Sequence, residues 1–283
     1  MEFIPAEKGQ AIRQPSTANL MIDSTDQQYN TGGGSNPFQF QITKNAAILN
    51  GFFTRVATTE VVLTWEESNI ETGVNDTFTV IKTAGSVSYT VTLAAGFYTV
   101  AQALDALVVA LNAAGTSLTW SISGTGATTG LAATGAFTVP DTTLLALQLR
   151  LVDTTSSTKS FVGNSPDLRP YRYIDFVSGD LTYNQDVKDA STSETQPQVL
   201  CRWYFAWDEQ PLLDTYGFPI LMGYTAFSAR RIFNPPKQIK WRPNQSIGNL
   251  SFRLLTPSGD VVPYDDTTGA FTNWQMTLQV SEV

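Results

Sequence analysis

Histidine is absent from the 283-residue chain, and cysteine occurs once, as Cys201. Without histidine the chain cannot form a Ser–His or Cys–His nucleophile pair, and the most common general base is missing. Zinc sites built on histidine or on cysteine clusters are excluded for the same reason. A single cysteine permits no internal disulfide bond, so nothing indicates a disulfide-stapled secreted scaffold.

Charged residues are also scarce, at 15% of the chain against about 25% in ordinary soluble domains. The hydrophobic share of 42% is large enough to bury a sizeable core, and threonine and aromatic residues are abundant. Because branched and aromatic side chains fit a pleated surface, this composition favours β-sheet. No apolar run reaches about 18 residues and the N-terminus lacks the pattern of a signal peptide, so we expect no membrane span.

Three pairs of adjacent carboxylates are the remaining candidates for catalysis, namely Glu66-Glu67, Asp208-Glu209 and Asp265-Asp266. A glycosidase needs two carboxylates about 5–10 Å apart that flank the scissile bond. Glu66 and Asp208 each end a tryptophan-containing strand, and tryptophan side chains suit sugars. Adjacent acidic residues at strand ends are more typical of solvated turns, and none of the pairs has the spacing of a calcium loop. We therefore expect a protein that is not an enzyme and needs no metal or organic cofactor.

Most of the chain has the pattern of short β-strands. Residues 38–42 alternate strictly between apolar and polar, and residues 59–65 have a nearly continuous apolar centre. Further strand-like segments cover 171–177, 199–207, 250–255 and 274–280. Many short strands separated by turns rich in proline and glycine are typical of a β-sandwich or jelly roll. The N-terminal residues 1–36 are polar and end in a glycine-rich stretch, which predicts a flexible, extended arm.

Residues 71–165 have a different pattern. The regular segments that we expect here are a hairpin over 77–81 and 86–93, a helix over 100–112, strands over 118–123 and 136–139, and a short helix over 142–149. Thr99 is placed to cap the first helix, Gly115 follows its end, and Asp141 is placed to cap the second. We expect the Gly- and Thr-rich stretch 124–135 to be a loop. The block is interpreted as a small α+β domain inserted into a jelly-roll domain of residues 37–70 and 166–283.

Basic residues are concentrated between Thr215 and Gly259, a segment that contains no aspartate or glutamate. Removing the +6 of this segment from the net charge of −8 leaves −14 on the rest of the chain. Such a segment fits nucleic-acid binding, or an interface at which a basic surface meets an acidic surface of a neighbouring subunit. Because the rest of the chain is strongly acidic, we favour the second. The residues expected at this inter-subunit interface are Arg230, Arg231, Lys237, Lys240 and Arg242.

Three parts of the sequence are familiar as a set: Ile42–Arg55 with Thr59–Trp65 and Asn69-Ile70, then Gly96–Leu107, and finally Asn249–Leu255 with Asn273–Glu282. Together they resemble the minor capsid, or penton, proteins of virophages and Polinton-like viruses. The resemblance covers the two ends of the chain and the predicted helix, about half of the length. It implies a single jelly roll that forms homopentamers at icosahedral fivefold vertices, with the inserted domain on the outer side and no catalytic residues.

The resemblance also implies partners and a location. The partners would be further copies of the chain and the major capsid protein of the same virion, and the inserted domain would be placed to meet a host receptor. The protein would be part of a virion that is assembled inside the host cell. A carbohydrate-binding jelly roll, such as a lectin-like module or spike domain, is the alternative from another class. Such a module acts as a monomer or small oligomer with exposed tryptophan, whereas a penton buries aromatic side chains between subunits.

Overall fold

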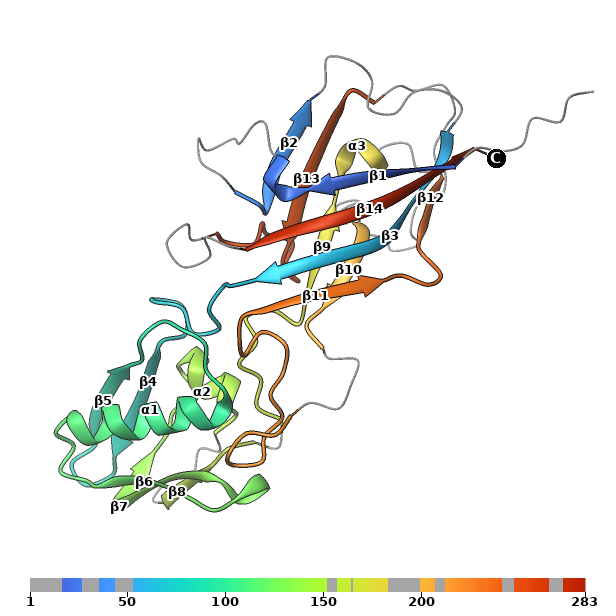
Figure 1. Ribbon diagram of the computed structural model, residues 1–283. Coiled ribbons are helices and arrows are strands. Elements are labelled where there is room, and N and C mark those ends of the chain that lie inside the picture. The colour runs from blue at the N-terminus through green and yellow to red at the C-terminus, as the bar shows by residue number, and fades with distance from the viewer. Residues whose placement is uncertain are drawn as a thin grey trace, which may run out of the picture.

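The computed structural model describes residues 17–26, 36–43, 53–151, 157–163, 165–182, 199–206, 212–240, 247–264 and 272–282. These residues form a β-sandwich and, at one end of it, a smaller unit of strands and helices (Figure 1). The C-terminus lies at the other end of the sandwich. Within the described part of the chain, no helix has the length and apolar character needed to cross a membrane.

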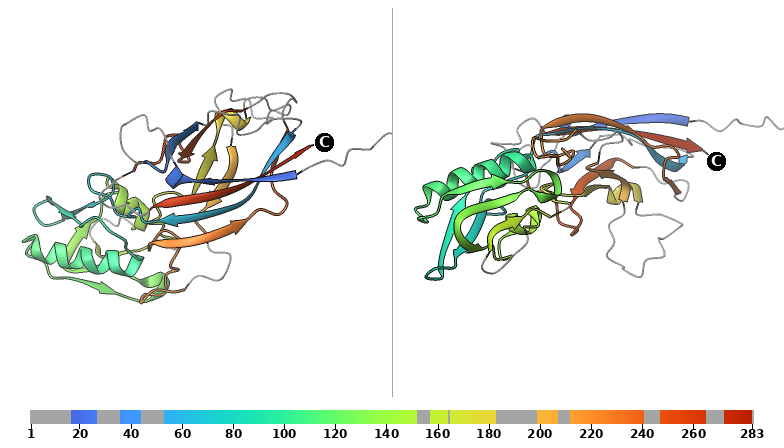
Figure 2. Two further views of the ribbon diagram at one scale, coloured as in Figure 1. Left: turned by 45° about the horizontal axis from the view of Figure 1, so that its top comes forward. Right: turned by 90° about the horizontal axis from the view of Figure 1, so that it is seen from below.

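The sandwich consists of two antiparallel sheets whose layers can be followed in Figure 2. The first sheet has the order β1-β14-β3-β11, and β12 also pairs with β3. Its strands are β1 (Thr17–Asp23), β3 (Phe53–Trp65), β11 (Phe227–Ile232), β12 (Gln238–Lys240) and β14 (Asn273–Glu282). The second sheet has the order β10-β9-β13-β2. Its strands are β2 (Gln39–Thr43), β9 (Tyr173–Val177), β10 (Val199–Tyr204) and β13 (Asn249–Leu255).

Alternation along the strands builds the core between the two sheets. In β14 every second side chain, beginning with Trp274, is buried, and the residues between them face outward. The Trp274 ring lies 5.4 Å from the ring of Phe40 and 5.2 Å from that of Phe176, both in the opposite sheet. Its indole N–H donates to the carbonyl of Pro37 at 2.7 Å, so the polar atom of this buried side chain is satisfied. The predicted mainly-β jelly-roll sandwich is confirmed.

The smaller unit has a third sheet, of order β5-β4-β7-β6, with β8 also paired to β7. Its strands are β4 (Thr77–Lys82), β5 (Val87–Thr92), β6 (Trp120–Ser123), β7 (Gly130–Thr138) and β8 (Ser157–Phe161), and its helices are α1 (Val100–Ala113) and α2 (Leu144–Leu149). Thr99 caps α1 as predicted, because its hydroxyl accepts from the Gln102 N–H and the Gln102 side chain accepts from the Thr99 N–H. The apolar face of α1 is buried in a core separate from that of the sandwich. This unit also has the short helix η2 (Gly126–Thr128), and the short helices outside it are η1 (Ser24–Asp26) and α3 (Gly179–Thr182).

Two local predictions in this unit are wrong. The expected loop over 124–135 is half strand, since β7 begins at Gly130. A Cβ atom at Gly130 would lie 2.0 Å from the Ser160 carbonyl oxygen, so glycine is required here by the close approach of β8 and not by a turn. The second helix is not capped by Asp141. It starts at Leu144, and Thr143 is its N-cap residue.

Part of the predicted flexible arm is a strand. Residues 17–23 form β1, which pairs with β14 along its whole length and is one edge of the first sheet. Ile22 is buried in the sandwich core, and Ser24 accepts a hydrogen bond from the Trp274 N–H at 2.9 Å. These contacts hold the segment on the sandwich, although its composition predicts a flexible arm. Of the predicted arm, the structure describes residues 17–26 and Asn36, and the other residues lie outside the described part.

Residues 212–224 follow the sandwich strand β10 in sequence but pack against the smaller unit. Phe218 and Tyr224 are buried in its core. The Asp214 carboxylate accepts from the Ala101 N–H at 2.9 Å, in the first turn of α1, and Tyr216 donates to Asp105 at 2.7 Å. The smaller unit is therefore completed by residues outside the expected insertion 71–165, and we call it the α+β unit.

Candidate functional site

Three of the basic residues singled out in the sequence lie along one edge of the sandwich. Arg230 and Arg231 are in β11, the edge strand next to β3, and Lys237 is in the connection from β11 to β12. Lys240 is the last residue of β12. Its side chain lies outside the described part of the chain, and so does all of Arg242. In an antiparallel edge strand, every second residue points its N–H and C=O groups away from the sheet, which leaves a template for pairing with another chain.

The basic side chains of this edge have different partners. Arg230 donates to both carboxylate oxygens of Glu60 on β3, at 2.6 and 2.8 Å, and this contact lowers the pKa of Glu60. The Arg231 guanidinium lies 5.1 Å from the centre of the Trp203 ring. The Lys237 ammonium donates to the carbonyl of Val199 at 3.0 Å. Arg231 and Lys237 thus reach β10 of the second sheet, so this basic edge, formed by β11 and the following connection, is held to both sheets.

The opposite edge of the first sheet is acidic. Residues 17–26 contain Asp23 and Asp26 and no lysine or arginine. Burial raises the pKa of Asp23, but hydrogen bonds from Thr25 and Gln275 outweigh it, so the net shift is downward and the carboxylate is ionised at neutral pH. Asp26 is exposed at the end of η1. Asp23 and Asp26 are not among the site candidates from the sequence, because the polar composition of residues 1–36 predicts a flexible arm.

The other candidates from the sequence do not form a reactive site in the described residues. Trp65 is fully buried, with its ring 4.9 Å from that of Phe205, so it is not a platform for sugars beside Glu66. Asp208-Glu209 and Asp265-Asp266 lie outside the described part. Burial raises the pKa of the Cys201 thiol, which disfavours the reactive thiolate. Within the described residues, no group of three His, Cys, Asp or Glu side chains is arranged to hold a metal ion.

Comparisons with known proteins were informative at the level of structure. No protein-family model and no curated protein matches the sequence. The solved structure of the mavirus penton protein matches with a TM-score of 0.52 and 13% identity, over 96% of this chain and 100% of that chain. A cryo-EM structure of the Sputnik virophage matches with a TM-score of 0.49 and 10% identity, over 94% of this chain and 97% of that chain. The chain thus has the fold of the mavirus penton protein, and the predicted likeness to virophage pentons is confirmed for the fold.

Proposed function

We propose that the chain is a structural subunit of a viral capsid, a penton that forms homopentamers at the fivefold vertices of an icosahedral particle. The observation that carries this proposal is the extent of the match to the mavirus penton protein, which covers 96% of this chain and all of that chain. An alignment of this extent includes the α+β unit as well as the sandwich. The function is then to present surfaces to neighbouring subunits, and no substrate is converted.

The charges on the two edges of the first sheet support assembly into a ring. One edge carries Arg230, which is paired with Glu60, together with Arg231 and Lys237, and the other edge carries Asp23 and Asp26. Because the two surfaces differ, their association is head-to-tail, and such contacts produce a ring when the rotation closes. Opposite charges favour the correct encounter and disfavour contact between like edges. We assign Lys240 and Arg242 to the same interface as Arg230. The number of five subunits in the ring comes from the likeness to the penton fold.

The likeness to the penton fold also suggests how the subunit is oriented in the particle. The α+β unit lies at the end of the sandwich away from the C-terminus (Figure 1). In the proposed orientation it is the outer domain, comprising residues 71–165 together with 212–224, and it is available to a host receptor. The jelly roll, residues 37–70 and the remainder of 166–283, contacts the major capsid protein of the same virion. The particle is assembled inside the host cell.

Electron microscopy of charge variants tests the proposed ring. Class averages of the purified protein are expected to show fivefold rings, and Arg230→Glu with Arg231→Glu is expected to reduce them to single subunits. Adding Asp23→Lys and Asp26→Lys to that double variant exchanges the charges of the two edges and should restore rings. Arg253→Glu, on β13 of the second sheet, is the matched control and should leave rings intact. Identical particles from the wild type and the double variant would contradict the assigned interface, and single subunits from the wild type would contradict the ring itself.

A further inference from the structure

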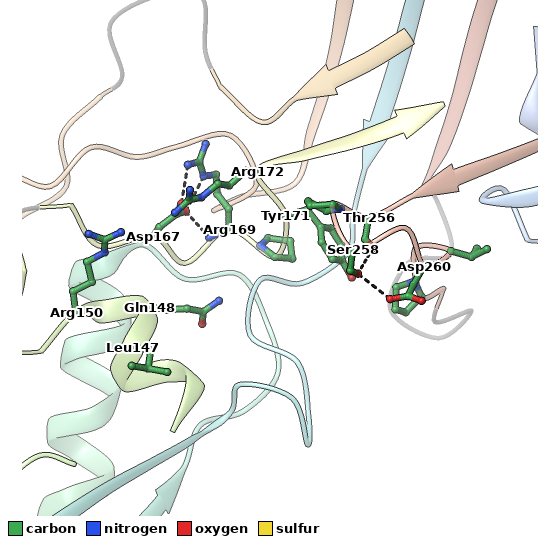
Figure 3. A pocket seen from close by; sticks show the side chains of 14 residues that line it. Leu147, Gln148, Arg150, Asp167, Arg169, Tyr171, Arg172, Thr256, Ser258 and Asp260 are labelled. Carbon is green, nitrogen blue, oxygen red and sulfur yellow. Dashed lines mark hydrogen bonds and ion pairs between the residues drawn. The ribbon is translucent and has the colours of Figure 1, made fainter. Parts of the chain in front are cut away.

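A pocket of about 590 Å³ lies where the sandwich meets the α+β unit (Figure 3). It is lined by residues of α2 and its C-terminal cap, by the segment 167–172 that leads into β9, and by the connection 256–263 after β13. Its volume is within the range of about 300–1,000 Å³ that is typical of sites for small molecules. The proposed ring contact uses the edges of the first sheet and leaves this pocket without a role.

One end of the pocket has an excess of positive charge. Arg169 donates to both oxygens of Asp167 at 2.8 Å and to the carbonyl of Phe205 at 2.6 Å, so its donors are largely used within the chain. Arg172 lies 3.5 Å from the same carboxylate and is 70% exposed, and Arg150 is exposed at the end of α2. Figure 3 shows Arg150 and Arg172 toward the same end of the pocket as Asp167. Three guanidinium groups against one carboxylate leave two positive charges for an anionic group of a ligand.

The rest of the pocket carries hydroxyl, amide and carboxylate groups. Ser258 donates to Asp260 at 2.8 Å and shares a hydrogen bond with Thr256. The carbonyl oxygen of the Gln148 side chain accepts from Asn75 at 2.9 Å, which leaves the amide N–H groups of Gln148 to donate to a ligand. Tyr171 forms part of the wall between the two ends, and its ring is braced by an edge contact with Trp65 at 6.4 Å. This part of the pocket is suited to a ligand with several hydroxyl groups and one apolar face.

We propose that the pocket binds an acidic saccharide that carries a single carboxylate. The carboxylate pairs with the guanidinium groups of Arg150 and Arg172, because planar forks of this kind match carboxylate geometry. The sugar hydroxyls bond to Gln148 and Asp260, and the ring lies against Tyr171. A small inorganic anion would leave the hydroxyl-lined end unused. A polyacidic peptide would bring a second negative charge toward Asp260, which repels it.

Titration calorimetry and ligand-observed NMR on the purified protein test this assignment. The probes are 3′-sialyllactose and glucuronic acid, with neutral lactose and tetraglutamate as comparisons. At least one acidic saccharide is expected to bind, and lactose and tetraglutamate are expected to bind at least tenfold more weakly or not at all. Arg150→Ala with Arg172→Ala is expected to weaken the binding about tenfold, which is the scale of one charge-assisted contact. Raised salt should weaken it as well.

Controls separate the binding site from the fold. Arg253→Ala removes an exposed arginine of β13 outside the pocket and should leave the affinity unchanged. Ser258→Ala changes only the hydroxyl-lined end and should weaken binding a few-fold, while thermal unfolding of each variant shows that it is folded. No binding of either acidic saccharide, equal binding of lactose, preferred binding of tetraglutamate, or an unchanged affinity in the double variant would each overturn the proposal. The pocket is complete within one subunit, so a negative result would not affect the proposed ring.

Discussion

Asp167 is the residue at which the joint between the sandwich and the α+β unit can be tested most directly. Its carboxylate holds Arg169 through two hydrogen bonds, and Arg169 in turn donates to Phe205 at the end of β10. On the side of the α+β unit, the backbone N–H of Asp167 donates to the backbone carbonyl of Gln148 in α2 at 2.8 Å. Asp167→Asn keeps the size of the side chain but removes its charge. The backbone bond to α2 is kept, so the variant should loosen the link through Arg169 to Phe205 of the sandwich while leaving both cores intact.

The expected loss in the free energy of unfolding follows from how far the Asp167–Arg169 ion pair is buried. The two side chains are 18% and 16% exposed, so the pair lies between a surface ion pair and a fully buried one. Exposed pairs contribute about 0–1 kcal/mol, whereas removing one partner of a buried pair costs about 3–5 kcal/mol. We expect Asp167→Asn to lower the free energy of unfolding by about 2 kcal/mol at pH 7. Asp260→Asn, at an exposed carboxylate, is the matched control and should change it by less than about 0.5 kcal/mol.

The stability lost in Asp167→Asn should also depend on pH, and it should be smaller at low pH than at pH 7. Burial raises the pKa of Asp167, but the hydrogen bonds and charge of Arg169 outweigh it, so the pKa in the folded protein lies below its usual value. A lowered folded pKa stabilises the protein above the unfolded pKa of about 3.9, and this contribution is lost as the pH falls through the folded value. Urea unfolding followed by tryptophan fluorescence at pH 7 and at pH 3 measures the difference. A loss no larger than that of Asp260→Asn, or one that grows toward low pH, would refute the reasoning.

Three further predictions concern residues that hold other parts of the fold. Asn69→Leu should destabilise the protein by about 2–4 kcal/mol in urea unfolding, because the buried Asn69 side chain forms two hydrogen bonds of 2.8 Å with the backbone of Tyr98. A loss below about 1 kcal/mol would contradict this role of Asn69. Asp214→Ala should increase proteolysis within residues 212–224, because the Asp214 carboxylate accepts from the Ala101 N–H and from two N–H groups of its own loop. Unchanged cleavage would show that Asp214 does not hold this segment against α1. Cys201 should resist thiol reagents in the native protein and react in urea, because burial raises its pKa; rapid native labelling would contradict its placement.

The sequence is informative where the cause of a structure is local. The alternation over 38–42 and 274–280 predicts β2 and β14, because the two faces of each strand differ in burial. The helix α1 is predictable together with its cap, since Thr99 and Gln102 lie within one turn of each other. In both cases the residues that determine the element are neighbours in the chain.

The sequence is uninformative where the cause lies far away in the chain. Only Leu20 and Ile22 of β1 face the core, so the strand has too weak a pattern to be recognised without β14, which is more than 250 positions away. Gly130 is required by the approach of β8, which cannot be read from the residues around it. The basic segment is evident in the sequence, but the pairing of Arg230 with Glu60 joins residues 170 positions apart.

The native mass of the purified protein tests the central proposal of a capsid ring most directly. One subunit has a mass of 30.9 kDa, so native mass spectrometry is expected to give a species of about 155 kDa for five copies. Raised salt should shift the population only mildly toward single subunits, because charges within an interface are screened less than exposed ones. A species of 30.9 kDa at all protein and salt concentrations would contradict the proposed ring.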